Sequence, residues 1–549
     1  MTTFRHVTIA LLFAVAVSAP RTLGQTKAQE EDKVDQIFAA YDKPNSPGCA
    51  LGVVRDGKFV YKKSYGMASL ELGVPITSES VFYMGSISKQ FTAASVVLAS
   101  EQGFLSLDDN VRKYVPELPD YGQPITLRQM LHHTSGFSDV LGMLWISGRN
   151  MGSLHPTAEL LDLIGQQKTL NFKPGEEYMY SNTNYFLLAE VVKRATKKPL
   201  SEFAAENIFR PLGMTHTHFH DDHTTVVAGR IPAYRPGQNG EFLVNWSIDY
   251  DMVGGGGLMS NVDDLLLWDQ NFYENKLGRG TLLKEMQTQG VLNNGTQTNY
   301  GLGLFLSTYR GLPIVEHGGA LFGYWNNILR FPEKKFTVIT LCNVSTAEPL
   351  RLTRKVADIY LEKDLQPPPA AVTAFDSDPT VFAGKYFDSG RHFLVSFTVA
   401  NGNLVLQGEA LHRVEANRFE APITGGIVMF SNANGVLRAT VVYEGTTTFT
   451  GTRISDFHPD NTALEAYSGM YKNAELGSTY KVSVKDGTLM LQMNWNPPIK
   501  LQPIVRDEFN VGEELTFVFR RDRAKHISAI NVFSGWNDVV RNVSFQKVK

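Results

Sequence analysis

The chain has 549 residues, of which 43% are hydrophobic and 19% are charged, so it is neither a disordered chain nor a highly charged one. Its 52 basic and 55 acidic residues leave a formal charge of −3, which gives no basis for a general affinity for nucleic acid or an anionic membrane. Two cysteines, Cys49 and Cys342, are too few for a disulfide scaffold or a cysteine-rich zinc site. We expect a large, soluble, globular protein of several domains.

Residues 1–24 are predicted to be a secretory signal peptide. An apolar run over residues 7–17 is followed by small residues up to Gly24, and we expect cleavage near Gly24–Gln25. Eleven apolar residues fall short of the roughly 18 that a membrane span needs. A buried N-terminal helix is the alternative. The sequence therefore predicts an exported protein, periplasmic or extracellular, with no membrane span.

A proline-rich linker over residues 366–378 divides the chain. Three consecutive prolines favour an extended spacer. Before the linker, the hydrophobic pattern predicts helices over residues 86–102, 260–273 and 349–362, whereas short alternating strands follow it. We expect a first domain over residues 25–365 and an all-β part after the linker.

The C-terminal part contains an internal repeat with an offset of 85 residues. Gly384 and Tyr386 recur as Gly469 and Tyr471, and the dipeptide at 401–402, Asn-Gly, recurs as Asp-Gly at 486–487. Both dipeptides suit a two-residue turn with positive φ, so each copy is predicted to begin with a β-hairpin. We expect β-barrel repeats of about eight strands each over 379–460 and 461–549. They form either two small lipocalin-like barrels or one barrel built from both halves.

Ser86 and Lys89 form one of three Ser-x-x-Lys sequences, the others being at 478–481 and 544–547. Residues three apart share a face of a helix but not of a strand. Only Ser86 opens a helical pattern, which ends at Gly103, so only Lys89 is expected to reach its serine. A serine hydroxyl becomes a nucleophile when a neighbouring group takes its proton. The alternative is that Ser86 caps the helix and Lys89 lies on the surface.

Two further motifs follow in the chain. Tyr180-Ser-Asn182 comes after a Pro-Gly turn and before an apolar helical pattern over residues 185–194. His317-Gly-Gly-Ala320 comes after an apolar strand pattern over residues 312–315. Its two glycines allow the backbone to approach a substrate closely.

In this order the three motifs resemble those of the serine β-lactamase and penicillin-binding-protein superfamily. Tyr180 in the second motif is similar to the class C β-lactamase branch, with its D-aminopeptidases, DD-peptidases and esterases. The segments 131–136, 211–214, 256–260 and 300–303 also resemble that branch, and the resemblance covers about residues 30–363. It implies an α+β domain, in which helices and a helical subdomain flank an antiparallel sheet, followed by the all-β domains.

The resemblance also implies a role for individual residues. Ser86 would attack a carbonyl and form an acyl-enzyme. Lys89 and Tyr180 would share the proton transfers, with Tyr180 as the base because the Lys89 cation lowers its pKa. The backbone N–H groups of Ser86 and Ala320 would form the oxyanion hole. Asn182 would bind the substrate amide or Lys89.

The third motif, His317-Gly318-Gly319, departs from the Lys-Thr-Gly of the lactamases and is more like that of D-aminopeptidases and related peptidases or esterases. This departure argues against β-lactamase activity. We expect His317 to act while protonated, on the pKa of Tyr180 or on a substrate carboxylate. The alternative is a neutral His317 that donates one hydrogen bond.

In the fold that the chain resembles, the first and last strands of the central sheet are antiparallel neighbours. Cys49 lies at the start of a strand pattern over 48–55, and Cys342 lies at the end of one over 336–343. The resemblance therefore implies that the two cysteines lie close together. Whether they form a disulfide stays open, because the required geometry is narrow.

Other conspicuous segments are assigned no chemistry. The histidine-rich segment 216–223 is interpreted as a solvated loop rather than a metal site. The four glycines 254–257 are interpreted as a flexible turn, with Ser260 and Asp263 capping the next helix. We expect neither a metal nor a cofactor.

The sequence thus predicts a secreted serine hydrolase that cleaves an amide or ester bond, in a peptide (aminopeptidase or DD-peptidase type) or in a carboxylic ester. Its partner would be a small-molecule or peptide substrate, and the sequence predicts no oligomeric state. One alternative is a non-hydrolysing, penicillin-binding-like sensor. The other is a carrier of an apolar ligand in the C-terminal barrels.

Overall fold

The structure, a computed structural model, describes residues 23–245, 251–367, 378–422, 424–443, 446–512, 514–534, 540–541 and 543–548. The predicted signal peptide lies outside the described residues up to residue 22, as does the predicted linker over 368–377. In the part of the chain that is described, no helix is both long and apolar enough to cross a membrane.

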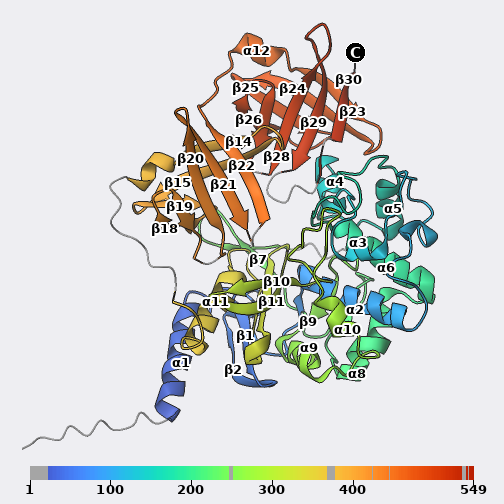
Figure 1. Ribbon diagram of the computed structural model, residues 1–549, viewed down its shortest axis with the longest axis vertical. Coiled ribbons are helices and arrows are strands. Elements are labelled where there is room, and N and C mark those ends of the chain that lie inside the picture. Colours follow the sequence, from blue (N-terminus) through green and yellow to red (C-terminus); the bar gives the residue numbers. More distant parts are fainter. Residues whose placement is uncertain are drawn as a thin grey trace, which may run out of the picture.

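A six-stranded antiparallel sheet forms the centre of the first domain (Figure 1). Its order is β10 (Phe305–Tyr309), β11 (Leu312–Leu321), β12 (Tyr324–Phe331), β13 (Phe336–Cys342), β1 (Cys49–Arg55) and β2 (Lys58–Tyr65). The expected strands over 48–55, 312–315 and 336–343 are confirmed as β1, part of β11 and β13.

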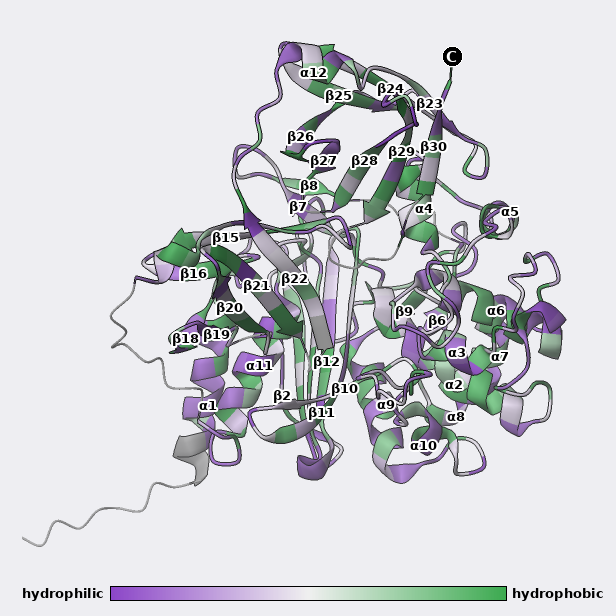
Figure 2. Ribbon diagram, turned by 45° about the horizontal axis from the view of Figure 1, so that its top comes forward, coloured by the Kyte–Doolittle hydropathy of each residue, from purple (hydrophilic) through white to green (hydrophobic). Residues whose placement is uncertain are grey.

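Helices cover both faces of this sheet because successive side chains of each strand point to opposite sides. Leu51 and Val53 of β1 pack with α1 (Leu23–Phe38) and α11 (Pro349–Tyr360), whereas Ala50 and Val54 belong to the core on the other face. Figure 2 shows that α1 is mostly hydrophilic, as expected of a helix that buries one side only.

The second face carries the helical subdomain, and short strands complete the first domain. Its helices are α2 (Ser88–Glu101), α3 (Leu127–Leu131), α4 (Val140–Ile146), α5 (Thr157–Gly165), α6 (Asn182–Thr196), α7 (Leu200–Ala204), α8 (Arg210–Leu212), α9 (Val262–Glu274) and α10 (Leu282–Met286). Short helical turns are η1 (Gly85–Ile87), η2 (Val111–Lys113), η3 (Ala205–Phe209) and η4 (Pro332–Lys334). The short strands are β3 (Met67–Ser69), β4 (Val74–Pro75), β5 (Phe82–Tyr83), β6 (His218–Phe219), β7 (Tyr234–Pro236), β8 (Phe242–Val244) and β9 (Leu258–Ser260).

The expected cap of α9 is wrong. Ser260 is buried in β9, and Asn261 caps the helix instead, because its Oδ1 accepts a hydrogen bond from the Asp264 N–H at 2.8 Å. Asparagine is among the residues that most favour this position.

The C-terminal part forms two separate β structures rather than one shared barrel (Figure 1). The first is a nine-stranded sheet with β14 (Gly384–Asp388), β15 (Phe393–Ala400), β16 (Asn403–Leu406), β17 (Glu409–Ala410), β18 (His412–Glu415), β19 (Arg418–Glu420), β20 (Ile427–Ala433), β21 (Val436–Tyr443) and β22 (Thr446–Ile454), preceded by η5 (Pro379–Phe382). The second is a closed barrel of β23 (Gly469–Asn473), β24 (Ser478–Lys485), β25 (Thr488–Met493), β26 (Ile499–Val505), β27 (Glu508–Val511), β28 (Leu515–Arg521), β29 (Ile527–Ser534) and β30 (Val543–Val548), preceded by α12 (Asn461–Glu465).

The internal repeat is visible in matching contacts. The Tyr386 hydroxyl donates to the Phe382 carbonyl at 2.9 Å, and the Tyr471 hydroxyl donates to the Tyr467 carbonyl at 2.6 Å, at the same offset of 85 residues. Both predicted hairpin turns are confirmed: residues 401–402 and 486–487 have positive φ and join β15 to β16 and β24 to β25.

The closed barrel docks on the end of α4. The Tyr480 hydroxyl donates to the Ile146 carbonyl at 2.5 Å, and the Ser478 hydroxyl and the Asn494 amide donate to the Ser147 carbonyl at 2.8 and 2.6 Å. The interior side chains of this barrel are continuous with the core of the first domain. The barrel therefore supports the helical subdomain directly.

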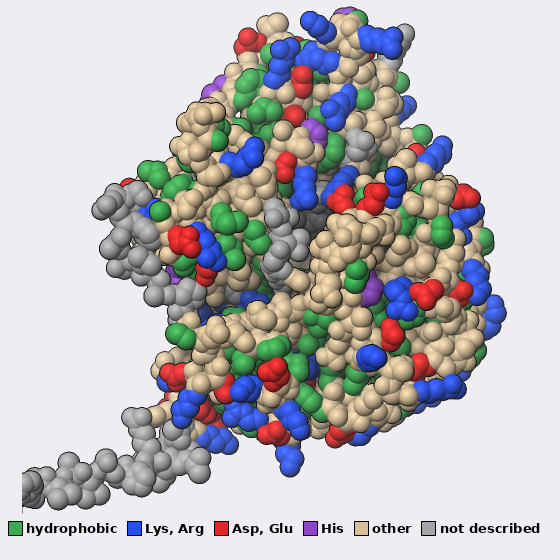
Figure 3. All heavy atoms as spheres, in the orientation of Figure 1, with side chains coloured by type: hydrophobic (Ala, Val, Ile, Leu, Met, Phe, Trp, Pro, Cys, Tyr) green, Lys and Arg blue, Asp and Glu red, His purple; other side chains and the backbone are tan. Residues whose placement is uncertain are grey.

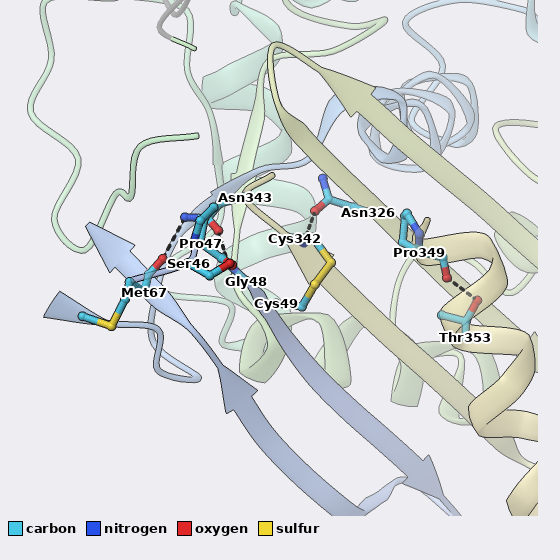
Figure 4. The surroundings of a disulfide bond; sticks show 10 residues. All are labelled: Ser46, Pro47, Gly48, Cys49, Met67, Asn326, Cys342, Asn343, Pro349 and Thr353. Atoms are coloured by element: carbon cyan, nitrogen blue, oxygen red, sulfur yellow. Dashed lines mark hydrogen bonds between the residues drawn. A yellow bond between two sulfur atoms is a disulfide. The ribbon is translucent and has the colours of Figure 1, made fainter. Parts of the chain in front are cut away.

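Cys49 and Cys342 face each other in the register of β1 and β13, with their Cα atoms 4.0 Å apart, and form a disulfide (Figure 4). The proximity of the two cysteines that the resemblance implied is confirmed. The disulfide, which the sequence left open, is present. The bond closes a loop of 293 residues between two buried strands.

Titration of denatured, unreduced protein should therefore find no free thiol. The double variant Cys49→Ala/Cys342→Ala should unfold with a free energy lower by about 3 kcal/mol, because the loop is no longer closed in the unfolded chain. Denaturant titration, with reduced wild type as the control, measures this loss. Two free thiols in the unreduced protein would contradict the disulfide.

Candidate active site

Ser86 lies in the turn η1, immediately before α2, and its side chain is half-buried in a cavity of about 770 Å³. The helix that follows is buried from Ser88 to Ala99, so it holds the turn firmly. Residues 86 and 87, the first two of the helix expected over residues 86–102, thus belong to the 3₁₀ turn η1 rather than to the α-helix. Because Ile87 occupies the cap position and no side chain caps α2, the alternative role of Ser86 as the helix cap is wrong.

Lys89 is fully buried, so the alternative of a surface lysine is also wrong. Its Nζ lies 3.1 Å from Ser86 Oγ, and it donates to Asn182 Oδ1 and to the Gly255 carbonyl, each at 2.7 Å. The same nitrogen lies 4.7 Å from the centre of the Tyr180 ring. The structure therefore brings the first and second motifs together around one amino group.

Burial lowers the pKa of Lys89 to about 7, and the negative charge of Asp139 opposes this shift. A neutral amine has two N–H donors and one lone pair. With the donors directed at Asn182 and Gly255, the lone pair faces the hydroxyl of Ser86. Lys89 can therefore accept the proton of Ser86 near neutral pH.

The protonation state of Tyr180 differs from the one expected of a general base. Burial raises its pKa well above the ordinary value, while a side-chain hydrogen bond with Ser86 opposes that shift. The expectation that the Lys89 cation lowers the pKa of Tyr180 is therefore wrong, because loss of hydration outweighs the other contributions. Tyr180 is a protonated phenol in contact with Ser86, and it can donate a proton rather than take one.

Asn182 is oriented by Asp139, a residue that the motifs did not include. The buried Asp139 carboxylate accepts a hydrogen bond from Asn182 Nδ2 at 3.0 Å, and it also accepts from the N–H groups of Leu141 and Gly142 at the start of α4. The amide oxygen of Asn182 is thereby directed at Lys89. A Ser-Asp pair before an apolar helical run is the sequence signal that could have identified this helix cap.

The four glycines 254–257, expected from the sequence to be a flexible turn, serve the site. Gly255 offers its carbonyl to Lys89, and Gly254 accepts a hydrogen bond from Thr92 of α2 at 2.8 Å. A Cβ on Gly254 would lie 2.2 Å from the carbonyl oxygen of Tyr185. Glycine is therefore required for this segment to pass between α2 and α6.

His317 is buried, and its pKa is lowered to about 3 by burial and by the charge of Lys89. Its Nδ1 lies 2.6 Å from the Gly318 carbonyl, which can only accept, so the proton is on Nδ1. Nε2 then accepts from the Tyr300 hydroxyl at 3.0 Å. The expected protonated role is wrong, since both ring nitrogens are satisfied in the neutral form.

The end of β11 presents its backbone to the turn that holds Ser86. A Cβ on Gly319 would lie 2.0 Å from the Met84 carbonyl and 3.0 Å from the Ser86 nitrogen, and a Cβ on Gly85 would lie 2.7 Å from the Ala320 nitrogen. The nitrogens of Ser86 and Ala320 are therefore neighbours, as an oxyanion hole requires. Pairing of β11 with β10 ends at Glu316, so the edge of the strand beyond it faces the cavity.

The cavity is walled by all three parts of the chain. The first domain contributes Ser86, Tyr180 and residues 317–320 together with Tyr178, Trp325 and the start of α11. The nine-stranded sheet contributes Arg391, Gln407, Gly408, Glu409, Thr424, Tyr443 and Thr448, and Arg541 comes from the last domain. Figure 3 shows charged side chains of both signs gathered where these domains meet.

The histidine-rich segment does not form the expected solvated loop throughout. His218 lies in β6, which pairs with β9, and His220 is buried. His223 pairs with Asp251 at 3.0 Å. Over the described ranges, no three His, Cys, Asp or Glu side chains are grouped so that they could hold a metal ion.

Comparison with known proteins agrees with this geometry. A family model described as Beta-lactamase matches residues 34–362. Penicillin-binding protein 4* of Bacillus subtilis is 30% identical over 333 residues, which cover 58% of this chain and 72% of that protein. A D-aminopeptidase of Gluconobacter oxydans is 25% identical over 388 residues, covering 68% and 70%.

The fold is shared with the octameric penicillin-binding protein homologue from Pyrococcus abyssi. The TM-score is 0.56 at 22% identity, and the match covers 84% of this chain and 97% of that one. The shared fold therefore extends beyond residues 34–362.

Replacement of Gly319 by alanine should destabilise the fold and abolish any reaction at Ser86, because the new Cβ collides with backbone on the Ser86 turn. Gly318→Ala is the matched control for folding, since its Cβ would meet only ordinary contacts of 3.5 Å or more. Thermal melting should show a loss of several degrees for Gly319→Ala and little change for Gly318→Ala. Equal melting temperatures for both variants would contradict the close approach.

The pH dependence should follow Lys89. A neutral Lys89 is the competent form, so kcat/KM should rise with pH through about 7 and level off above it. His317→Gln should leave the midpoint of this rise unmoved, because His317 is neutral throughout the range. Rate profiles of wild type and His317→Gln on one amide substrate measure this. If His317→Gln shifted the pH midpoint of the rise in kcat/KM, His317 would have to be charged within this pH range.

Proposed function

The chain belongs to the beta-lactamase family, and on this premise we propose that it is a serine hydrolase that cleaves an amide bond through an acyl-enzyme on Ser86. The observation that carries the proposal is the buried Lys89 amino group, 3.1 Å from Ser86 Oγ and with its pKa near neutrality. The names of the relatives, a D-aminopeptidase and a penicillin-binding protein, support an amide in a peptide as the substrate.

In the first step, Ser86 Oγ attacks the carbonyl carbon while its proton passes to Lys89. The positive charge that forms on Lys89 is stabilised by Asn182 Oδ1 and the Gly255 carbonyl. The oxygen of the former carbonyl becomes an anion, for which the N–H groups of Ser86 and Ala320 are the donors.

In the second step, the leaving nitrogen takes a proton and the C–N bond breaks. Tyr180, protonated and in contact with Ser86, is the donor on this side, and the net source of the proton is Lys89, which holds the proton taken from Ser86. Water then attacks the acyl-enzyme while neutral Lys89 takes its proton, and this proton passes to Ser86 Oγ as the acyl group leaves, which regenerates Ser86.

The cavity supports a peptide as the substrate rather than a single small group. Its volume of about 770 Å³ exceeds the space for one amino acid, and its walls offer charged side chains of both signs beside Trp325 and Tyr443. We propose aminopeptidase or DD-peptidase activity as the main reaction. A carboxylic ester of similar shape is a second substrate, because it forms the same acyl-enzyme.

The alternative of an apolar-ligand carrier gains no support from the C-terminal domains. Aromatic rings pack against each other inside both β structures, with Phe382 stacked on Phe430 at 4.5 Å and Tyr480 stacked on Phe545 at 3.8 Å. These side chains belong to the hydrophobic cores of the two β structures.

We also propose that the protein is exported. The apolar run at residues 7–17 supports a signal peptide, and the disulfide between Cys49 and Cys342 supports an oxidising compartment. N-terminal sequencing of the mature protein should then find a start near Gln25.

Ser86→Ala should abolish covalent labelling by a fluorophosphonate and lower kcat on peptide amides by about 10⁴-fold or more, with the fold unchanged. The matched control is Ser544→Ala, which removes the serine of another Ser-x-x-Lys sequence, on β30. Intact-mass spectrometry and steady-state kinetics measure both variants. Retained labelling of Ser86→Ala would contradict the proposal, and a labelling burst without turnover in wild type would favour the sensor.

A further inference from the structure

His133 lies directly beside the second motif, and the mechanism above gives it no role. Its side chain is fully buried, and its backbone has a φ of +58° in the turn that follows α3. Histidine is one of the few residues other than glycine that are enriched in this left-handed region. The turn brings both the carbonyl and the ring of His133 against residues 179–181.

The two residues that flank Tyr180 are both bound to His133. The carbonyl oxygen of His133 accepts a hydrogen bond from the Met179 N–H at 2.9 Å, and its Nδ1 accepts from the Ser181 N–H at 3.1 Å. The amide nitrogen of Asn184, on α6, donates to the same Nδ1 at 3.2 Å. One buried residue therefore fixes the backbone on either side of Tyr180.

The ring of His133 also packs against the ring of Tyr180. The two ring centres are 4.3 Å apart, and the planes are inclined by 32°. The imidazole is held in place by the rings of Tyr185 and Tyr300, whose centres lie 5.0 and 4.8 Å away. Close packing of this kind leaves a side chain few alternative rotamers. The imidazole thus limits the directions in which the Tyr180 hydroxyl can point, and that hydroxyl is the group in contact with Ser86.

His133 is held in its neutral form. Because Nδ1 accepts from a backbone N–H, the ring proton is on Nε2, which has no hydrogen-bond partner among the residues that the structure describes. Burial and the neighbouring charge of Lys89 lower the pKa of His133 well below its ordinary value. A second proton would have to displace the Ser181 N–H from Nδ1. His133 therefore acts through the position of its neighbours rather than by exchanging a proton.

We propose that His133 is a positioning residue that directs the Tyr180 hydroxyl toward the leaving nitrogen through its contacts with residues 179–181. The inference rests on the proposed function, in which Tyr180 gives its proton to that nitrogen. A well-placed proton donor contributes a factor of about 10²–10⁴ to a rate. The contribution of His133 should therefore be lost only where the leaving group needs a proton.

Two leaving groups separate this role from general support of the fold. A peptide amide needs a proton on its leaving nitrogen, whereas a nitrophenyl ester of the same acyl group releases a stable anion. The value of kcat/KM reports acylation of Ser86 by either substrate. Tyr180→Phe is the reference variant. It should lower kcat/KM by about 10²-fold or more for the amide and by less than about threefold for the ester.

Two variants of His133 remove different contacts. His133→Asn tolerates the positive φ and keeps an acceptor at the same number of bonds from Cα, so it removes the ring but retains the hydrogen bonds. His133→Ala removes both. We expect kcat/KM for the amide to fall about tenfold in His133→Asn and about 10²-fold in His133→Ala, with the ester value within about threefold of wild type. His133→Asn provides the measurement if His133→Ala fails to fold.

The matched control is His132→Asn. His132 is the adjacent buried histidine, and its Nδ1 lies 3.2 Å from the Tyr300 carbonyl rather than beside residues 179–181. This variant should keep the wild-type ratio of amide to ester rates. A selective loss of the amide reaction in His132→Asn equal to that in His133→Asn would overturn the proposal.

A double variant tests whether His133 acts through Tyr180. In the Tyr180→Phe background, His133→Asn should cause no further loss of the amide rate, because the proton donor is already absent. A tenfold loss that persists in this background overturns the proposal. Equal losses on amide and ester in the single variant His133→Asn overturn it as well, since they indicate general damage to the site.

Fluorophosphonate labelling of Ser86 separates failure of this inference from failure of the proposed function. If wild type is labelled and Tyr180→Phe loses the amide reaction selectively, but both His133 variants keep the wild-type ratio, the positioning role is overturned and the proposed function stands. If wild type is not labelled, the proposed function fails, and the inference fails with it. If Tyr180→Phe lowers both rates equally, Tyr180 is not the donor, and the positioning role is overturned.

Discussion

The amino group of Lys89 has no access to solvent, and the chemistry of the site depends on that burial. Loss of hydration disfavours the ammonium and lowers the pKa of Lys89 to about 7, and the negative charge of Asp139 opposes this shift. Asn182 Oδ1 and the Gly255 carbonyl accept the hydrogen bonds of the amino group. The same burial keeps His317 neutral and Tyr180 protonated. The positive charge that the reaction creates on Lys89 therefore appears among oxygens that are already in place, so little reorganisation is needed.

The fold keeps this arrangement rigid by close backbone contacts. Gly319 brings β11 against the Ser86 turn, and Gly254 allows its loop to pass between two helices. Asp139 connects Asn182 to the start of α4, and the C-terminal barrel holds the other end of that helix through Tyr480. The closed barrel, which contributes Arg541 to the cavity wall, thus also supports a helix that orients the site.

The sequence predicted what depends on local patterns. The helix that follows Ser86, the strands that carry the cysteines and the two hairpins of the repeat follow from periodicity and turn residues, and the family follows from three motifs in order. It did not predict the neutral states of His317 and Tyr180, because their pKa values depend on burial, which only the folded chain defines. Asp139 and Gly255 were missed for a related reason. Their contacts with Asn182 and Lys89 join residues more than 40 positions apart.

The most direct measurement is the pKa of Lys89 itself. NMR titration of protein labelled with ¹³C at lysine Cε, with the Lys89 signal assigned by its absence in Lys89→Arg, reports the ionisation of this one amino group. The account predicts a midpoint near 7 in the free enzyme, well below the 10.5 of an ordinary lysine. A Lys89 signal that titrates near 10.5 would contradict it, because the lysine would then be an ammonium at neutral pH and could not take the proton of Ser86.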